Sequence, residues 1–175
     1  MAVRLPQSTT GRARLRQLVP GGQELRIEVA SRPEAGDILI SPQRCAQIVW
    51  LVSIGDSQDA LPAGYDNIPH KLRLLVADVV TEQGATEEDI LQIVRLAEEL
   101  RSETGTVLIH CEAGVSRSSA AALIMYAYWF GPGREQEAMA RVLSQRPVAI
   151  PNRRMIELAD RLLDRAGRLV EALGH

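Results

Sequence analysis

The chain has 175 residues, enough for one domain with a sizeable hydrophobic core. Apolar residues make up 46% and charged residues 24%, and the net charge of −2 provides no overall attraction to nucleic acids or anionic membranes. Two cysteines, Cys45 and Cys111, are too few for a disulfide framework, and no apolar run suits a signal peptide or a membrane span. We therefore expect a cytoplasmic protein that holds any anion at a local site, with neither nucleic acid nor a membrane as partner.

The first half of the chain predicts short strands separated by loops. Residues 1–24, which close with Pro20-Gly21-Gly22, are interpreted as an arm or irregular lead-in, followed by one domain over residues 25–175. Strands are predicted at 25–30, 37–40, 48–54 and 72–76, with a brief helix from Ser41-Pro42 to residue 47. Asp78 lies just beyond the last of these strands.

The second half is mainly helical. Thr86 and Asp89 resemble a capping box, and apolar residues at helical spacing follow as far as Gly105, where we expect the helix to end. A buried strand at 106–109 and a loop at 110–117 precede an apolar helix at 118–130, which Gly131-Pro132-Gly133 ends. Two amphipathic helices are predicted at 134–144 and 153–172, the second capped by Asn152.

This alternation of strands and helices indicates an α/β fold. We expect a single domain with a mainly parallel central sheet of about four to five strands, flanked by helices on both faces. Ligands of such sheets bind outside the carboxyl ends of the strands. Asp78 and Cys111 both fall at such ends.

The segment from Cys111 to Ser118 has the order that an anion site requires. A buried strand delivers Cys111, a loop containing Gly114 follows, and a buried helix begins near Arg117. Amides of a curled loop and of a helix N-terminus bind anions and favour a thiolate, and glycine lets the loop curl. Arg117 offers a planar fork for two phosphate oxygens, and the Ser118 hydroxyl can hydrogen-bond the sulfur. The predicted phosphate-binding loop consists of Glu112, Ala113, Gly114, Val115, Ser116 and Arg117.

The run His-Cys-Glu-Ala-Gly-Val-Ser-Arg-Ser at 110–118 is similar to the signature of the protein tyrosine phosphatase superfamily, and its second half most resembles the dual-specificity phosphatases. A second likeness is Arg-Pro-Val-Ala-Ile-Pro-Asn at 146–152, and the resemblance covers residues 48–163. It implies a cysteine-dependent phosphatase domain that needs no metal or cofactor. Cys111 would attack phosphorus to form a cysteinyl-phosphate that water then hydrolyses.

The resemblance also implies an aspartate that protonates the leaving group, some thirty residues before the cysteine. Asp78 lies 33 positions before Cys111 and fits this role. The competing acids are Asp56, Asp59, Asp66 and Glu82. His110 is expected to brace the loop through hydrogen bonds, and Asn152 is expected to cap a helix or to touch the phosphate loop.

The variable positions of the loop bear on the substrate. No lysine accompanies the loop, which disfavours inositol lipids, and the acidic Glu112 disfavours very acidic substrates. We expect phosphotyrosine, with phosphoserine and phosphothreonine as further candidates, on a phosphorylated protein or another phosphomonoester. The alternatives are the same chemistry on an RNA 5′ end, a phospholipid or a small metabolite, a rhodanese-like sulfur carrier, and a phosphoprotein-binding module without turnover. The oligomeric state stays open.

Overall fold

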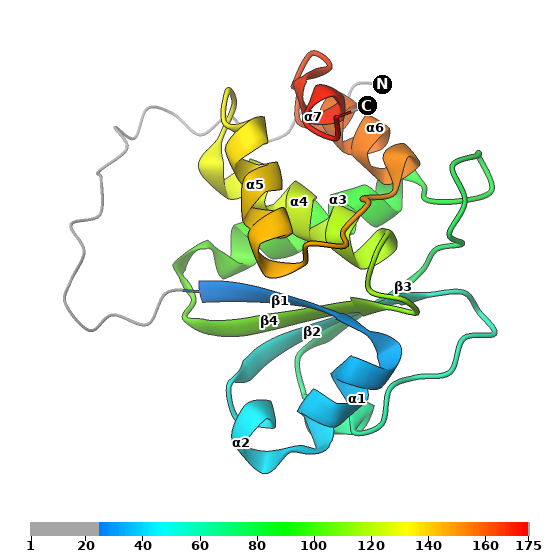
Figure 1. Ribbon diagram of the computed structural model, residues 1–175, viewed down its shortest axis with the longest axis vertical. Coiled ribbons are helices and arrows are strands. Elements are labelled where there is room, and N and C mark those ends of the chain that lie inside the picture. The colour runs from blue at the N-terminus through cyan, green and yellow to red at the C-terminus, as the bar shows by residue number, and fades with distance from the viewer. Residues whose placement is uncertain (1–24, 175) are drawn as a thin grey trace.

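The computed structural model describes residues 25–174, so the interpretation of residues 1–24 as an arm lies outside the described part. At its centre is a four-stranded sheet in the order β1-β4-β2-β3, in which all neighbouring strands are parallel (Figure 1). The strands are β1 (Leu25–Ser31), β2 (Ile48–Gly55), β3 (Lys71–Leu75) and β4 (Gly105–Cys111). The predicted fold class is confirmed.

Helices cover both faces of this sheet. Two short helices, α1 (Arg32–Ile40) and α2 (Pro42–Cys45), lie on one face (Figure 1). On the other face are α3 (Glu87–Glu99), α4 (Arg117–Phe130), α5 (Glu135–Gln145), α6 (Arg153–Leu162) and α7 (Arg168–Glu171). No helix of the described residues is both long enough and apolar enough to cross a membrane.

Each face of the sheet has its own hydrophobic core. The larger core joins the sheet to α3 and α4–α7, and its centre is α4, whose residues from Arg117 to Ala127 are all buried. The smaller core packs α1 against the opposite face through Ile38 and Leu39, which contact the cluster around Leu51 and Leu108. In the sheet, β4 lies between β1 and β2, and one layer of helices packs on each of its faces. Its carboxyl end is therefore fixed by neighbours in the sheet and by both helix layers.

The strand predicted at residues 37–40 is wrong, because these residues form the second half of α1. The side chain of Ser31 accepts a hydrogen bond from the amide of Glu34, and the carboxylate of Glu34 accepts one from the amide of Ser31. This capping box starts a helix whose buried positions Ala35, Ile38 and Leu39 recur at helical spacing. The three-residue apolar run Ile38-Leu39-Ile40 alone could not distinguish the two structures.

The long helix predicted at residues 153–172 is two helices, α6 and α7. Asp164 and Ala166 adopt positive φ angles of 53°, which end α6. The carboxylate of Asp160 accepts hydrogen bonds from the amides of Gly167 (2.7 Å) and Leu169 (2.9 Å) at the start of α7. A buried side chain from the preceding helix therefore fixes the break. The helix predicted to run up to Gly105 is an α-helix as far as Glu99 and continues as a 3-10 turn over Leu100–Ser102, and Gly105 begins β4.

Candidate active site

Cys111 is the last residue of β4, and its side chain is only 1% exposed. Its sulfur lies 3.1 Å from the hydroxyl oxygen of Ser118, in the first turn of α4. Burial on its own raises the pKa of the thiol. The hydroxyl of Ser118 and the backbone amides of Ser118, Gly114 and Val115 outweigh that effect, so the pKa of Cys111 lies below its ordinary value. The loop therefore favours a thiolate, as the sequence predicts.

The loop between Cys111 and Arg117 turns its carbonyl groups outward. The carbonyls of its first, fourth and fifth residues each accept a backbone hydrogen bond from another part of the chain. The donors are Arg32 to Glu112 (3.1 Å), Ile150 to Val115 (2.9 Å) and Asn152 to Ser116 (3.1 Å). With the carbonyls bound outside, the amide groups face the sulfur, where they form a cup suited to an oxyanion.

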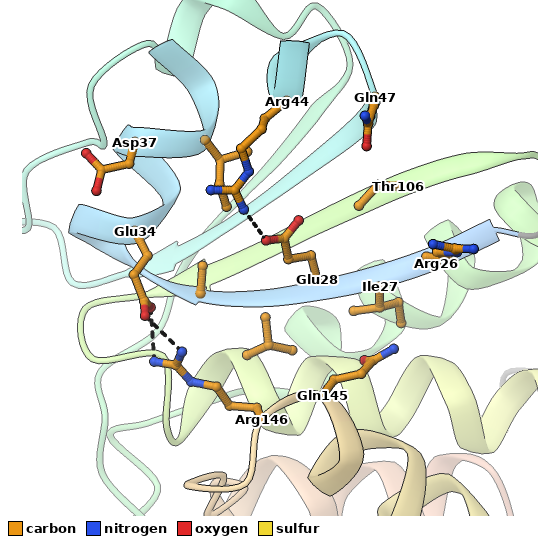
Figure 2. Close-up of a pocket in the computed structure, with 13 residues that line it drawn as sticks. Arg26, Ile27, Glu28, Glu34, Asp37, Arg44, Gln47, Thr106, Gln145 and Arg146 are labelled. Atoms are coloured by element: carbon orange, nitrogen blue, oxygen red, sulfur yellow. Dashed lines mark hydrogen bonds and ion pairs between the residues drawn. The ribbon is translucent and has the colours of Figure 1, made fainter. Parts of the chain in front are cut away.

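Arg146 binds the two remaining carbonyls of the loop. Its Nε donates to the Gly114 carbonyl at 3.0 Å, and its terminal nitrogen donates to the Ala113 carbonyl at 3.4 Å. The carboxylate of Glu34, on α1, holds the same guanidinium at 3.0 Å (Figure 2). The hydrogen bond from Arg146 lowers the pKa of Glu34 to about 2, so this pair stays ionised at neutral pH. The sequence marks Arg146 only as part of a motif, and nothing in it predicts this contact with Glu34 and the loop carbonyls.

Gly114 allows the loop to lie against β1. Its φ angle is +68°, in the left-handed region, and a Cβ atom at this position would lie 2.5 Å from the amide nitrogen of Ser31. Ser31 is also paired with Cys111 across the sheet. Because glycine has no side chain, Gly114 permits both the positive φ angle and the close contact between the loop and β1.

Arg117, 4% exposed, is the first residue of α4. Its NH1 donates to the Val76 carbonyl at 2.8 Å, which fixes the guanidinium at the end of β3. Its Nε is buried and has no hydrogen-bond partner among the described residues. An unpaired buried donor is costly, and an oxyanion in the cup would satisfy it.

Three carboxylates surround this guanidinium. Asp56 and Asp59 lie 3.8 and 3.7 Å from its NH1, and Asp78 lies 3.7 Å from its Nε. These distances are longer than hydrogen bonds, so the donors of Arg117 are not consumed by them. Asp56 and Asp59 come from the loop after β2 and Asp78 from the loop after β3. Carboxyl ends of neighbouring strands thus bring together acids that are far apart in the sequence.

Asp78 is the carboxylate that contacts the phosphate-binding loop directly. Its Oδ1 accepts hydrogen bonds from the Ser116 hydroxyl (2.6 Å) and from the side-chain amide of Asn152 (3.0 Å). Asn152 also caps α6, because its Oδ1 accepts from the amide of Met155 at 3.2 Å. Asn152 therefore fulfils both alternatives: its side chain caps α6, and its backbone amide donates to the Ser116 carbonyl of the loop.

The other residues named from the sequence lie as follows. His110 is 1% exposed, its Nδ1 is 3.3 Å from the Cys111 carbonyl, and burial lowers its pKa to about 4, so the imidazole is neutral at pH 7. Asp66 has a 96% exposed carboxylate, and its ion pair, with Lys71 at 3.5 Å, lies outside the cup. Glu82 is exposed in the loop before α3. Neither Asp66 nor Glu82 forms an ion pair with Arg117.

Comparisons with known proteins place the fold but do not assign a family by sequence. No protein-family model matches the chain, and no curated protein matches it.

Solved structures of phosphatases and of a phosphatase-like protein do match it. Human DUSP28 superposes with a TM-score of 0.59 at 21% identity, over 79% of this chain and 88% of that one. The phosphatase domain of Yvh1 from Chaetomium thermophilum gives 0.58 at 22% identity, over 85% of this chain and 95% of that one. A human tyrosine phosphatase-like serine/threonine/tyrosine-interacting protein gives 0.61 at 19% identity, over 77% and 87%. The resemblance to dual-specificity phosphatases that the signature predicts is confirmed at the level of the fold.

Proposed function

We propose that this chain is a cysteine-dependent phosphatase that hydrolyses phosphate monoesters through a covalent intermediate on Cys111. The observation that carries the proposal is the environment of the sulfur. It is hydrogen-bonded by Ser118 and lies in a loop whose carbonyls are all bound outside. The buried donor of Arg117 that lacks a partner lies at the end of the same loop. A thiolate, converging amides and a guanidinium are the groups that phosphoryl transfer requires.

In the first step, the thiolate of Cys111 attacks phosphorus in line with the ester oxygen. The S–P bond forms as the P–O bond to the leaving group breaks, and the leaving oxygen takes a proton from Asp78. The amides of the loop and the fork of Arg117 bind the equatorial oxygens, on which negative charge is spread in the transition state. The contacts of Asp78 with Ser116 and Asn152 support this assignment, because they hold its carboxyl group over the loop.

In the second step, water attacks the cysteinyl-phosphate. Asp78, now ionised, takes a proton from this water, the S–P bond breaks, and inorganic phosphate leaves. The departing sulfur becomes a thiolate again, and the hydroxyl of Ser118 can stabilise it by a hydrogen bond. As proposed, neither step needs a metal ion or a cofactor.

The proposed substrate is phosphotyrosine, with phosphoserine and phosphothreonine as further candidates. Two alternatives use the same site, namely the same chemistry on a non-protein phosphomonoester and binding of phosphoproteins without turnover. The second is kept because one similar structure is described as a phosphatase-like interacting protein. Against it, this chain has the cysteine, the arginine and a carboxylate in one site.

The test uses p-nitrophenyl phosphate without added metal. We expect hydrolysis that vanadate inhibits, and we expect Cys111→Ser to abolish turnover while inorganic phosphate still binds. The matched control is Cys45→Ser, because Cys45 is half-buried at the end of α2 and is not a site residue. Activity that survives Cys111→Ser would exclude the covalent mechanism. Phosphate binding without turnover in the unchanged protein would identify a binding module.

A further inference from the structure

Exposed apolar side chains lie on two loops that border the cup. Among the described residues, eight large apolar side chains are exposed, and four of these lie on two loops that reach the site. Val79 and Val80 directly follow Asp78 and are 38% and 63% exposed, and Val148 and Ile150 precede Asn152 and are 58% and 72% exposed. Four exposed apolar side chains on two loops that border the same site make this border a candidate binding surface.

Hydrogen bonds join these two loops to each other and to the cup. The side-chain amide of Asn152 donates to the Val79 carbonyl at 3.3 Å as well as to Asp78. The backbone amide of Ile150 donates to the carbonyl of Val115, which is a half-buried residue of the phosphate-binding loop. Val79, Val80, Val115, Val148 and Ile150 therefore belong to connected segments, and we call them the apolar rim.

The charged side chains near the cup disfavour the binding of acidic ligands. Arg32 is bound by both carboxylate oxygens of Glu112, at 2.8 and 3.1 Å, and Arg146 is bound by Glu34. Their positive charges are thus already matched by protein groups. Asp56 and Asp59, near Arg117, add negative charge at the same end of the sheet.

On these grounds we propose that the apolar rim selects phosphopeptides whose residues next to the phosphorylated side chain are apolar, and that it discriminates against acidic neighbours. This inference rests on the proposed function and names the substrate class of the same site. An aliphatic side chain that packs on the rim removes apolar surface from water, which is favourable. A carboxylate there would lose hydration without forming an ion pair in return.

A peptide fits the rim better than a membrane surface. Side chains that dock on anionic lipid are accompanied by unpaired Lys or Arg and by interfacial Trp or Tyr. The rim has only Val and Ile. Of the arginines next to it in the chain, Arg146 pairs with Glu34 and Arg153 with Glu157, and the half-buried Arg154 donates to the Ala85 carbonyl.

The test compares two phosphotyrosine peptides of equal length, one with Leu and one with Glu on both sides of the phosphotyrosine. We expect kcat/KM to be about tenfold higher for the Leu peptide, because covering one aliphatic side chain is worth about 1.5 kcal/mol. In Ile150→Lys and in Val80→Lys, which remove apolar contact and add a cation, the Leu-to-Glu ratio should fall several-fold. Ile40→Lys is the matched control. Ile40 is 59% exposed at the far end of α1, and its replacement changes the net charge equally, so the ratio should stay as in the unchanged protein.

Equal kcat/KM for the two peptides, or an equal fall of the ratio in Ile40→Lys, would overturn the inference. Hydrolysis of p-nitrophenyl phosphate but of neither peptide would also overturn it and leave the proposed function standing. Failure to hydrolyse p-nitrophenyl phosphate as well would instead remove the proposed function. Sedimentation with phosphatidylcholine–phosphatidylserine vesicles that Ile150→Lys abolishes would assign the rim to a membrane and overturn the inference too.

Discussion

At the scale of single residues, the sulfur of Cys111 is governed by two opposing effects. Burial favours the neutral thiol, whereas hydrogen bonds from Ser118 and from the loop amides favour the thiolate. The net lowering of the pKa depends on donors that lie within one turn of helix and one loop. A single lost donor should therefore be measurable.

Removal of the Ser118 hydroxyl should raise the pKa of Cys111. We expect the rate of alkylation by iodoacetate, measured against pH in a Cys45→Ser background, to show an inflection below the ordinary thiol value of about 8.5. Ser118→Ala removes a hydrogen-bond donor to the Cys111 thiolate, so the inflection should move to higher pH. At pH values between the inflection of the unchanged protein and that of the variant, the variant should be alkylated more slowly. Ser144→Ala is the control, because that hydroxyl bonds the Arg141 carbonyl on the exposed surface of α5. An inflection at the same pH in Ser118→Ala would contradict this account of the thiolate.

The contribution of Asp78 to kcat should be largest for esters whose leaving group must be protonated. For Asp78→Asn we expect kcat on phenyl phosphate to fall about 100-fold, because a positioned general acid contributes at least that much, and kcat on p-nitrophenyl phosphate to fall much less. Nitrophenolate leaves without protonation, so the two esters separate acid catalysis from damage to the site. Asp66→Asn is the control, since its carboxylate is almost fully exposed. A fall of equal size on both esters, or a selective fall in Asp59→Asn, would assign the acid elsewhere.

At the scale of secondary-structure elements, the phosphate-binding loop is held by its neighbours rather than by its own contacts. The start of α1, the segment before α6 and the first turn of α4 each provide donors for its carbonyls. The glycine in the middle of the loop allows it to reach β1.

Gly114→Ala and Gly133→Ala form a matched pair. Both glycines have positive φ, +68° and +87°, so alanine costs about 1–2 kcal/mol at either position. A Cβ at Gly133 would have nothing within 4 Å, whereas one at Gly114 would lie 2.5–2.8 Å from the backbone of Ala30 and Ser31. We expect Gly114→Ala to lower the free energy of unfolding by about 2 kcal/mol more than Gly133→Ala does, in urea titrations, and to abolish phosphatase activity. Equal losses of stability would show that the close approach is not needed.

Arg146→Met should weaken the loop without removing a group that touches phosphate. The change keeps an apolar stem but leaves the carbonyls of Ala113 and Gly114 without their charged donor, which is worth about 1.5–3 kcal/mol. We expect kcat/KM for p-nitrophenyl phosphate to fall tenfold or more and the inhibition constant of vanadate to rise. Arg44→Met is the control, because Arg44 on α2 pairs with Glu28 of β1 and not with a carbonyl of the loop (Figure 2). An unchanged vanadate constant in Arg146→Met would contradict a bracing role.

The same contact has a predictable pH range. The pKa of Glu34 is lowered, so its ion pair with Arg146 contributes fully above the ordinary carboxyl pKa and is lost only as the pH falls toward about 2. The ion pair between Glu34 and Arg146 should therefore be intact throughout the range from pH 5 to 8.

At the scale of the whole molecule, the site is a consequence of a parallel sheet. All four strands end at the same edge, and each strand delivers one part of the site there. β4 delivers Cys111 and the loop, β1 delivers Ser31 and α1, β2 delivers Asp56 and Asp59, and β3 delivers the Val76 carbonyl and Asp78. The two hydrophobic cores fix these ends relative to one another, which is the preorganisation that a site for a charged transition state needs.

Much of this arrangement could be predicted from the sequence, because it depends on local signals. The apolar strand before Cys111, the glycine in the loop and the capping residues Thr86 and Asn152 act within a few residues of their own positions. The capping box of Ser31 and Glu34 was an equally local signal, with Pro33 in the first turn. The apolar run at 38–40 favours a strand instead, and the structure shows that the capping box is the stronger signal.

The contacts that could not be predicted join residues far apart in the chain. Nothing in a single sequence pairs Arg146 with Glu34, which precedes it by 112 positions, or Arg32 with Glu112. The break between α6 and α7 likewise combines a local signal, the positive φ of Gly167, with contacts of the buried Asp160 carboxylate, which accepts from the amides of Gly167 and Leu169. Long side chains that brace a loop leave no periodic pattern.

The central claim is that Cys111 carries the phosphoryl group during turnover, and chemical trapping tests it most directly. The protein would be mixed with p-nitrophenyl phosphate, quenched in acid within the first turnover, digested and mapped by mass spectrometry. We expect one phosphoryl group on the peptide that contains Cys111, and none in Cys111→Ser. A phosphoryl group on another residue, or continued turnover with no adduct in either protein, would contradict the account.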